Sequence, residues 1–466
     1  MSKYDLIVIG SGPGGYIAAE YAAKQGLHTL IIESDNFGGV CLNKGCIPTK
    51  TLLKSSKVLE YLVEANKYGI EGLSKEGISL NWPKIQERKN NVVKQLQNGI
   101  GGLLKSAKVE VIKGIATVLS NNTVSVNDTI IEFDKLIVAT GSTPRKFTNI
   151  PGFEQGYASG KLITSDEALV LSEIPKKLTV IGGGVIGVEF ATLYAGLGSQ
   201  VTILQGVDRI LEVLDNDISK EITSLLQKEN VNIITNINLV EFKDNNVVYT
   251  INGETKVDDA DVVLVSVGRV PTSDCVKQIG VNLEKNGSII TNEHMQTNFE
   301  NIYAIGDCTS RIMLAHTAHK NALVAVDHIL NKPNKYEPLK VPSCIYTHPE
   351  VASIGYTEEQ LIEKNIPYYK GKTPMTHIGK ALADGESKGF LKLLVGKEYG
   401  EILGCHIVAS TASDIISEIA LAMELEATIY DLTNTIHPHP TISEIVWETA
   451  KKILTDNFKD KKWFKN

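Results

Sequence analysis

Apolar and polar residues near the start of the chain follow the order strand, turn, helix, strand. Residues 4–9 (YDLIVI) are apolar enough for a buried strand, and a helical pattern extends to Lys24. The apolar run HTLIIE comes next and ends at Glu33. The turn between the first strand and the helix carries Gly10, Gly12 and Gly15. Its spacing is G-x-G-x-x-G, so the unit predicts a dinucleotide-binding fold.

The same pattern returns in the middle of the chain. Residues 177–187 (KLTVIGGGVIG) predict a strand and a turn with Gly182, Gly184 and Gly187, and a helical run and the strand QVTIL follow. Gln205 stands after that strand, where the first copy has Glu33; Gly10 to Glu33 and Gly182 to Gln205 each span 23 positions. A packing turn would explain either copy alone, but two copies with equal spacing indicate two dinucleotide sites.

The glycines of such a unit have separate functions. The first allows a tight turn, the second lets the backbone approach a pyrophosphate, and the third allows close packing of helix on sheet. The helix N-terminus favours phosphate groups, and Glu33 is placed to accept hydrogen bonds from a ribose diol. Two dinucleotides in one chain suggest an electron path, with a flavin at one site and a nicotinamide at the other.

Two of the six cysteines lie close together in residues 38–50 (GGVCLNKGCIPTK). Pro48 suits the first turn of a following helix, so Cys46 would lie near a helix N-terminus, where the dipole favours a thiolate. Cys41 would then exchange with a substrate disulfide. The alternatives are a structural disulfide, a metal site and two unrelated core cysteines, although the short loop and the lack of further ligands disfavour the first two. Beside two nucleotide motifs, the pair predicts redox activity.

Composition and charge exclude several other classes of function. The net charge of −7 gives no basic excess for binding nucleic acid or an anionic membrane. The longest apolar stretches, such as 262–267, are too short to span a bilayer. The N-terminal residues lack the basic start and cleavage site of a signal peptide. We therefore expect a soluble cytoplasmic protein, and no metal site is predicted.

The cysteine segment resembles the redox-disulfide signature of the pyridine nucleotide–disulfide oxidoreductases. LIVATGSTPR (136–145), the second glycine motif, AIGDC (304–308) and HPHPTISE (437–444) follow in the order of that family. The resemblance covers essentially the whole chain. It implies an α/β protein with two Rossmann-like dinucleotide-binding domains, for FAD and NAD, and a C-terminal α+β dimerisation domain.

Two motifs, CLNKGCIPTK and HPHPTISE, are most similar to family members that oxidise protein-bound dihydrolipoamide with NAD⁺. This resemblance implies a homodimer that binds the lipoyl domain and the acyltransferase core of a 2-oxoacid dehydrogenase complex. An NADPH-dependent reductase of another small disulfide is the alternative on the same fold. A non-catalytic flavoprotein subunit is the alternative from a different class, and the complete Cys–Cys–His–Glu set argues against it.

The family pattern also implies roles for charged residues. Thiol–disulfide exchange needs a base, and His439 with Glu444 matches the family's base and its orienting carboxylate, which act on the disulfide of the other subunit. Spacing alone would leave His439 an ordinary histidine. Lys50 and Glu189 match a pair beside the flavin, although most such residues are simply exposed charges. His437 has no implied role.

The resemblance assigns further residues to each cofactor. For FAD they are Gly10, Gly12, Gly15, Glu33, Lys50, Gly114, Thr140, Gly141, Gly306, Asp307 and Ala315. For NAD they are Gly182, Gly184, Gly187, Gln205 and Gly268. Each of these glycines alone would be interpreted as a turn residue.

Gln205 is a departure from the family, whose NAD-dependent members usually carry glutamate. Glutamate binds the ribose 2′-hydroxyl and repels a 2′-phosphate, whereas glutamine keeps an acceptor and loses the repulsion. Because no cationic residue at 205 or 206 would attract a phosphate, we expect NAD rather than NADP. The segment 315–329 is less acidic than is usual in the family, and its His319 and Lys320 are assigned no role.

The motifs predict four consecutive regions. They are an FAD-binding domain with the disulfide (1–145), an NAD(P)-binding domain (146–270), a return to the FAD domain (271–340) and a dimerisation domain (341–466). A Pro-bearing stretch at 331–342 marks the last boundary. The segment 413–426 has an apolar face at helical spacing that is ordinarily core and could also pack across a dimer.

Overall fold

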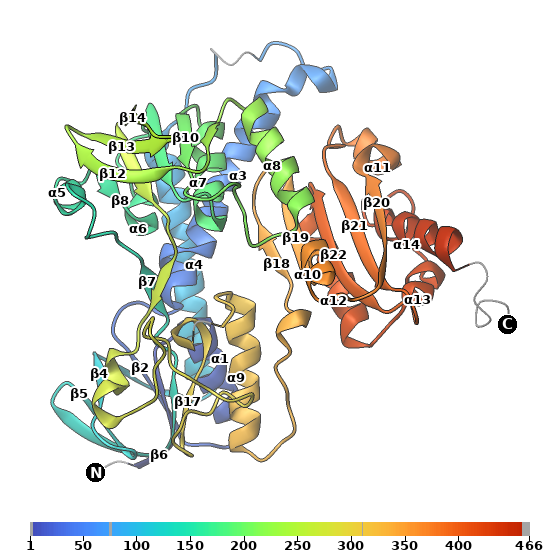
Figure 1. The fold of residues 1–466 in the computed structure, drawn as a ribbon. Coiled ribbons are helices and arrows are strands. Elements are labelled where there is room, and N and C mark those ends of the chain that lie inside the picture. Colours follow the sequence, from blue (N-terminus) through green and yellow to red (C-terminus); the bar gives the residue numbers. More distant parts are fainter. Residues whose placement is uncertain (1–2, 74–76, 310, 459–466) are drawn as a thin grey trace. The chain divides into compact units, whose positions relative to one another are not determined.

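The computed structural model describes residues 3–73, 77–309 and 311–458, and Figure 1 shows the course of the chain. The chain forms two compact units, each built from separate stretches of sequence. Unit 1 comprises 1–149, 153–174 and 264–336, and unit 2 comprises 150–152, 175–263 and 337–466. The end of the expected dimerisation domain, residues 459–466, lies outside the described residues.

Unit 1 is built on a seven-stranded sheet with the order β3-β2-β1-β6-β5-β4, in which β17 also pairs with β6. The strands are β1 (Lys3–Ile9), β2 (Thr29–Glu33), β3 (Glu110–Lys113), β4 (Ala116–Val118), β5 (Thr123–Val126), β6 (Thr129–Val138) and β17 (Ile302–Ala304). The pairs among β3, β2, β1, β6 and β17 are parallel, and those of β5 with β4 and β6 are antiparallel. Every residue of β2 is buried, as expected of a parallel strand covered on both faces.

The helices of unit 1 include those predicted after the first glycine motif and after the cysteine segment. They are α1 (Pro13–Lys24), α2 (Gly39–Lys44), α3 (Cys46–Val63), α4 (Trp82–Ser106), α5 (Phe153–Ala158), α6 (Ser165–Ala168) and α9 (Ala315–Ile329), with short 3₁₀ turns at Ala65–Tyr68, Asp274–Ile279 and Gly306–Thr309. Helix α1 buries small residues against its neighbours, and an added Cβ at Gly14 would lie 3.1 Å from the Ala318 oxygen of α9. Small side chains therefore let α1 and α9 pack closely. Shorter strands of this unit are β7 (Ser142–Pro144), β8 (Leu162–Ile163) and β16 (Arg269–Pro271), and β7 pairs with β16.

Unit 2 repeats the strand–turn–helix–strand pattern. Its parallel strands are β9 (Lys177–Ile181), β10 (Gln200–Leu204) and β11 (Asn232–Ile234), with helices α7 (Val185–Gly196) and α8 (Asn216–Lys228). An antiparallel sheet follows, made of β12 (Asn238–Lys243), β13 (Asn246–Ile251) and β14 (Glu254–Asp259). Strand β15 (Val262–Val265) spans the division between the two units.

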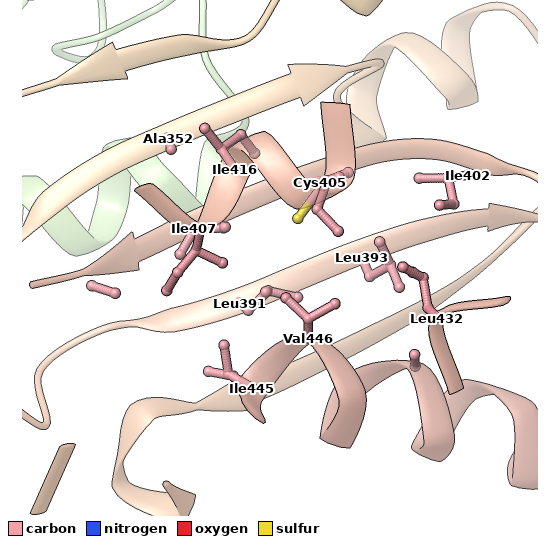
Figure 2. Close-up of a cluster of buried hydrophobic side chains, with 14 of the residues drawn as sticks. Ala352, Leu391, Leu393, Ile402, Cys405, Ile407, Ile416, Leu432, Ile445 and Val446 are labelled. Atoms are coloured by element: carbon pink, nitrogen blue, oxygen red, sulfur yellow. The ribbon is translucent and has the colours of Figure 1, made fainter. Parts of the chain in front are cut away.

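The C-terminal part of unit 2 is an antiparallel sheet with the order β18-β19-β22-β21-β20. Its strands are β18 (Ser343–Ile345), β19 (Glu350–Gly355), β20 (Tyr368–Pro374), β21 (Phe390–Gly396) and β22 (Ile402–Ala409). Its helices are α10 (Glu358–Glu363), α11 (Gly379–Ala383), α12 (Ala412–Glu424), α13 (Ile429–Asn434) and α14 (Glu444–Asn457), with 3₁₀ turns at Pro338–Lys340 and Met375–His377. Figure 2 shows the apolar cluster that joins this sheet to its helices, with Leu391, Cys405 and Ile407 of the strands near Ile416 and Val446.

Helix α12 confirms the helical segment predicted near residues 413–426. One face, which includes Ile415, Ile416 and Ile419, is buried in the core of unit 2. Two large apolar residues of this region, Leu421 at 60% and Leu425 at 70%, are instead exposed on the single chain. Ile436, three residues before His439 of the HPHPTISE motif, is 94% exposed.

The compact units do not coincide with the four regions expected from the motifs. Residues 175–263 form one unit with the C-terminal segment, and 153–174 group with unit 1. The division at 336 and 337 falls within the Pro-bearing stretch 331–342. In the part of the chain that is described, no helix combines the length and the apolar character needed to cross a membrane.

Candidate functional site

The first glycine turn has the geometry predicted for it. Gly10 has φ +96°, and a Cβ there would lie 2.4 Å from the Ala139 oxygen, so only glycine fits. A Cβ at Gly15 would lie 1.9 Å from the Gly10 oxygen, which explains the close packing of α1 on the turn. Gly12 differs, because its φ is −62° and the nearest atom to an added Cβ is 3.9 Å away. Nothing in the protein itself requires glycine at this position.

Glu33 is buried at the end of β2 and holds the turn. Its Oε2 accepts hydrogen bonds from the Ser11 backbone N–H at 2.7 Å and the Ser11 hydroxyl at 2.6 Å. Its Oε1 accepts one from the Asp35 N–H at 2.7 Å and has room for another donor. The motif did not single out Ser11, although its place between Gly10 and Gly12 could have suggested it.

The second turn repeats this arrangement with an amide. Gly182 has φ +103°, and the Gly183 N–H donates to Gln205 Oε1 at 2.8 Å, as Ser11 does to Glu33. The Gln205 Nε2 donates to the Arg209 oxygen at 3.2 Å. A Cβ at Gly184 would meet no atom within 4 Å, and φ there is −76°.

These observations fit two bound dinucleotides. Helices α1 and α7 both begin at a glycine without a side-chain cap, and neither has an acidic residue in its first turn. The free N–H groups of their first turns are therefore suited to donate hydrogen bonds to phosphate oxygens. Gly12 and Gly184, where the protein leaves space for a Cβ, are the positions at which a pyrophosphate would need the backbone bare.

Gly12→Ala tests this fit directly. We expect the variant to fold normally, because the protein has room for the methyl group, but to bind FAD at least about tenfold more weakly, because the ligand does not. The flavin-to-protein absorbance ratio after gel filtration and the melting temperature measure the two effects. Gly15→Ala is the matched comparison and should lower both the flavin content and the melting temperature. Full flavin content in Gly12→Ala would contradict the assignment.

Five of the flavin candidates lie at one edge of the unit 1 sheet. Each follows the carboxyl end of a parallel strand: Gly10 after β1, Glu33 at the end of β2, Gly114 after β3, Thr140 after β6 and Gly306 after β17. Open α/β sheets bind ligands outside these ends. Ala315 begins α9, and Gly187 is a buried residue of α7.

Asp307, Arg269 and Ser142 form a polar cluster at the same edge. The Ser142 hydroxyl donates to Asp307 Oδ2 at 2.6 Å, and Arg269 Nε lies 2.7 Å from that hydroxyl and 3.9 Å from Asp307 Oδ2. Burial lowers the pKa of Arg269. Gly268, expected on the nicotinamide side, has φ +100°, and its oxygen accepts from the Arg145 N–H at 3.0 Å. Ser142 lies within LIVATGSTPR and Arg269 directly follows Gly268, but the family pattern gives neither residue a role.

Thr140 and Gly141 are held by the return of the chain near residue 272. The Thr140 hydroxyl donates to the Thr272 oxygen at 2.5 Å, and the Thr272 N–H donates to the Gly141 oxygen at 2.9 Å. Gly141 has φ +72°. These contacts fix the backbone between β6 and β7, where the family pattern places flavin contacts.

Cys41 and Cys46 form a disulfide, with their Cα atoms 4.7 Å apart. Cys46 is the first residue of the long helix α3, as predicted from Pro48. The disulfide segment is joined to the first glycine turn, because the Gly38 N–H donates to the Ser11 oxygen at 2.9 Å. Gly39 has φ +57°, and a Cβ there would lie 2.6 Å from the Gly12 Cα. Glycine at position 39 thus allows the close approach of this segment to the nucleotide turn.

Asn43, between the two cysteines, was not predicted to matter. Its Nδ2 donates to the Phe37 oxygen at 3.0 Å and to the Gly39 oxygen at 2.8 Å. These bonds tie the chain between the cysteines to the turn that precedes it.

Lys50 and Glu189 are placed by separate units. Lys50 lies on α3 of unit 1, one turn after Cys46. Glu189 lies on α7 of unit 2, is 5% exposed, and its Oε1 accepts a hydrogen bond from the Tyr346 N–H at 3.0 Å. The backbone of the C-terminal segment therefore orients Glu189. The pairing of Lys50 with Glu189 stays a prediction.

His439 and Glu444 are brought together at the start of α14. His439 Nδ1 lies 2.8 Å from Glu444 Oε1, and Glu444 Oε2 accepts from the Thr441 N–H at 2.9 Å. The Thr441 N–H, and then His439, hold the pKa of Glu444 below its usual range. Since a carboxylate only accepts, Nδ1 donates its proton to Glu444, and in the neutral imidazole the lone pair is then on Nε2. The His439 side chain is 78% exposed on the single chain.

The histidines without assigned roles have structural partners. His437 Nε2 lies 2.8 Å from Glu418 Oε1, so its buried side chain ties the loop between α13 and α14 to α12. His319 Nε2 lies 3.4 Å from the Tyr16 hydroxyl, and burial, followed by the nearby His316, lowers the pKa of His319. Within the described ranges, no three His, Cys, Asp or Glu side chains are grouped to hold a metal ion.

Comparison with known proteins places this geometry in context. The family model described as pyridine nucleotide-disulphide oxidoreductase matches residues 4–322, and the dimerisation domain of the same family matches residues 341–450. Dihydrolipoyl dehydrogenase of Mycoplasma pneumoniae is 48% identical over 98% of this chain and 100% of its own length. Dihydrolipoyl dehydrogenase of Geobacillus stearothermophilus is 41% identical, covering 97% and 96%.

The fold also matches a solved structure. The Cu(II) complex of the HOCl-induced flavoprotein disulfide reductase RclA from Escherichia coli has a TM-score of 0.86 at 26% identity. The match covers 97% of this chain and 100% of that one.

Proposed function

The chain belongs to the pyridine nucleotide–disulphide oxidoreductase family, and we propose that it oxidises protein-bound dihydrolipoamide to lipoamide and reduces NAD⁺. The observation that carries the proposal is the disulfide joined directly to a dinucleotide turn, in a chain that also has an ordered histidine–carboxylate pair. The family and its relatives establish an enzyme with FAD and NAD as cofactors.

The protein's own residues would divide the first half of turnover among them. His439 Nε2, with Nδ1 held by Glu444, would take a proton from the dithiol. The resulting thiolate would attack Cys41 Sγ, so that the Cys41–Cys46 bond breaks and Cys46 leaves as a thiolate. The second substrate thiol would then displace Cys41 and close the lipoamide disulfide.

The second half of turnover returns the cysteines to the disulfide. Bound FAD would supply a two-electron acceptor, and NAD⁺ would finally take the electrons as hydride. The position of Cys46 at the N-terminus of α3 stabilises its thiolate for this step. Lys50 and Glu189 are proposed to lie beside the flavin. Product leaves before the second substrate reacts, so ping-pong kinetics are expected.

The dimerisation domain supports a homodimer. We propose further that His439 and Glu444 act on the disulfide of the other subunit, which is consistent with the exposure of His439 on one chain. The lipoyl domain and the acyltransferase core of a 2-oxoacid dehydrogenase complex are the proposed partners. The four regions 1–145, 146–270, 271–340 and 341–466 remain the proposed domains, and a cytoplasmic location remains a prediction from the sequence.

The proposed function is tested by steady-state oxidation of dihydrolipoamide with NAD⁺ and NADP⁺ measured side by side. We expect turnover with NAD⁺ at a kcat/KM at least about tenfold above that with NADP⁺. Gln205→Glu should widen this ratio by about a further tenfold, because a carboxylate repels a 2′-phosphate that the amide tolerates. Glu33→Gln is the matched exchange at the first turn and should leave the cofactor ratio unchanged.

No turnover with either nicotinamide cofactor would overturn the proposal. The reductive direction, with NADPH and other small disulfides, would then be the reaction to examine. A flavin-containing protein inactive in both directions would favour the structural subunit instead.

A further inference from the structure

A row of polar side chains crosses the C-terminal sheet on the face opposite the apolar core of Figure 2. Leu391 and Leu393 of β21 belong to that core, so strand alternation puts Lys392 on the other face. Register partners on β20, β21, β22 and β19 form the row: Lys372, Lys392, His406 and Ser353.

Lys392 is the buried member of this row, with a side chain only 2% exposed. Its Nζ lies 3.0 Å from both carboxylate oxygens of Asp215, 3.1 Å from Asp217 Oδ2 and 2.6 Å from Glu358 Oε2. Burial opposes its charge, but hydrogen bonds to Glu358 and Asp215 outweigh this and raise the pKa of Lys392. One buried ammonium group therefore contacts three carboxylates, two of which, Asp217 and Glu358, also pair with the more exposed Lys372 and Lys370.

Asp215 is the most enclosed of the three carboxylates, with no exposed surface. It caps α8, since its Oδ1 accepts from the Asp217 N–H at 3.0 Å. Its Oδ2 accepts from the Glu358 N–H at 3.1 Å and lies 3.8 Å from His406 Nε2. Asp215 thus ties the start of α8 to two elements of the C-terminal segment, α10 through Glu358 and β21 through Lys392.

The loop that ends at Asp215 begins at the second nucleotide turn. This 206–215 loop follows Gln205, whose side chain bonds the Gly183 N–H and the Arg209 oxygen. The Leu211 N–H donates to the Gly183 oxygen at 2.8 Å. A Cβ at Gly183 would lie 2.5 Å from Ile210 Cγ2, so the loop packs directly on the turn.

We propose that Lys392 is a positioning residue for the nicotinamide dinucleotide. By holding Asp215, it fixes the far end of the 206–215 loop, and the loop in turn holds Gly183 and Gln205 in the geometry that receives the adenosine ribose. This inference rests on the proposed function, because it takes the second turn as the NAD site.

A purely structural role for Lys392 makes a different prediction. Losing the ammonium leaves Lys372 beside Asp217 and Lys370 beside Glu358, but the buried Asp215 loses its ammonium partner, which is costly. If the cost were only structural, the melting temperature would fall and the rates with both substrates would fall together. If Lys392 acts on the nucleotide turn through the 206–215 loop, its loss weakens dinucleotide binding but leaves reduction of the flavin by the dithiol unaffected.

Lys392→Met in the full-length flavoprotein separates these two cases, with Lys372→Met as the matched control. Lys372 is the register partner of Lys392 and lies 3.2 Å from the same Asp217, but its side chain is 46% exposed. The measurements are calorimetric titration with ADP-ribose, KM for each substrate, anaerobic flavin reduction by dihydrolipoamide, and hydrogen exchange of residues 206–215.

For Lys392→Met we expect ADP-ribose affinity to fall and KM for NAD⁺ to rise at least about tenfold, with faster exchange in the loop. Flavin reduction by the dithiol should stay within about twofold, and Lys372→Met should change none of these values by more than about twofold. Lys392→Met with unaltered ADP-ribose affinity would overturn the proposal, whatever its stability.

Asp215→Asn gives an independent answer if Lys392→Met does not fold. Asparagine keeps the helix cap but removes the charge that Lys392 holds, so a rise of at least about threefold in KM for NAD⁺ is expected. Unchanged affinity in this variant would overturn the proposal. Because ADP-ribose binding needs no dithiol, an inactive wild-type protein that still binds it would refute the proposed substrate without refuting the positioning role.

Discussion

Cys46→Ser is expected to abolish dihydrolipoamide oxidation while leaving FAD bound. Serine cannot form a disulfide with Cys41, so the dithiol has no S–S bond to attack and no Cys46 thiolate is released, and turnover should fall at least about a thousandfold. FAD should stay because its proposed contacts lie along the strand ends of unit 1. Flavin absorbance and anaerobic titration with the dithiol measure the two parts.

Cys275→Ser is the control for this experiment. Cys275 is a free cysteine, and burial raises its pKa to about 12, so its thiol is not ionised at neutral pH. The control should keep nearly full activity. Normal activity in Cys46→Ser would show that electrons do not pass through the disulfide.

His439→Gln is expected to lower kcat/KM for dihydrolipoamide by about a hundredfold to ten-thousandfold, because the proton acceptor is lost. Glu444→Gln should also lower it, for a reason specific to this geometry. The Thr441 N–H would orient the new amide oxygen, so that the NH₂ group faces His439 Nδ1. Nδ1 would then have to accept, and the proton would move to Nε2, where the base is needed.

The pH dependence of kcat/KM distinguishes this account from a general loss of structure. The pKa of Glu444 is held low, so this carboxylate stays ionised at neutral pH and adds no titration there. The part of the kcat/KM profile that rises with pH should therefore disappear in His439→Gln. His437→Gln is the control, because His437 precedes His439 by two residues but contacts Glu418. This variant should keep the rising part of the profile. A wild-type profile in His439→Gln would assign the base elsewhere.

Local patterns carried most of what could be predicted. Strand β1, helix α1 and strand β2 end close to the expected residues, and β9, α7 and β10 repeat them, because apolar period and glycine spacing act within some 25 positions. The α/β class and the two nucleotide-binding units are confirmed. The disulfide and the His439–Glu444 contact also join residues only five positions apart.

Contacts between distant residues could not be predicted in the same way. Lys392 and Asp215 are 177 positions apart, and no sequence pattern in either segment predicts a buried ion cluster. The bond from the Tyr346 N–H to Glu189 uses a backbone group, which has no sequence signal at all. Tertiary topology decides these contacts, so a single sequence gives only the candidates.

The exposed apolar residues near α12 have a consequence for the thermal stability of this protein. Leu421, Leu425 and Ile436 would face water on a solitary chain, a condition that favours association. If two copies bury such a surface between them, unfolding also requires the copies to dissociate. By mass action, the melting temperature should then increase with protein concentration. Dilute samples would then lose their fold at lower temperatures than concentrated ones, and newly made chains would be most vulnerable to aggregation before they find a partner.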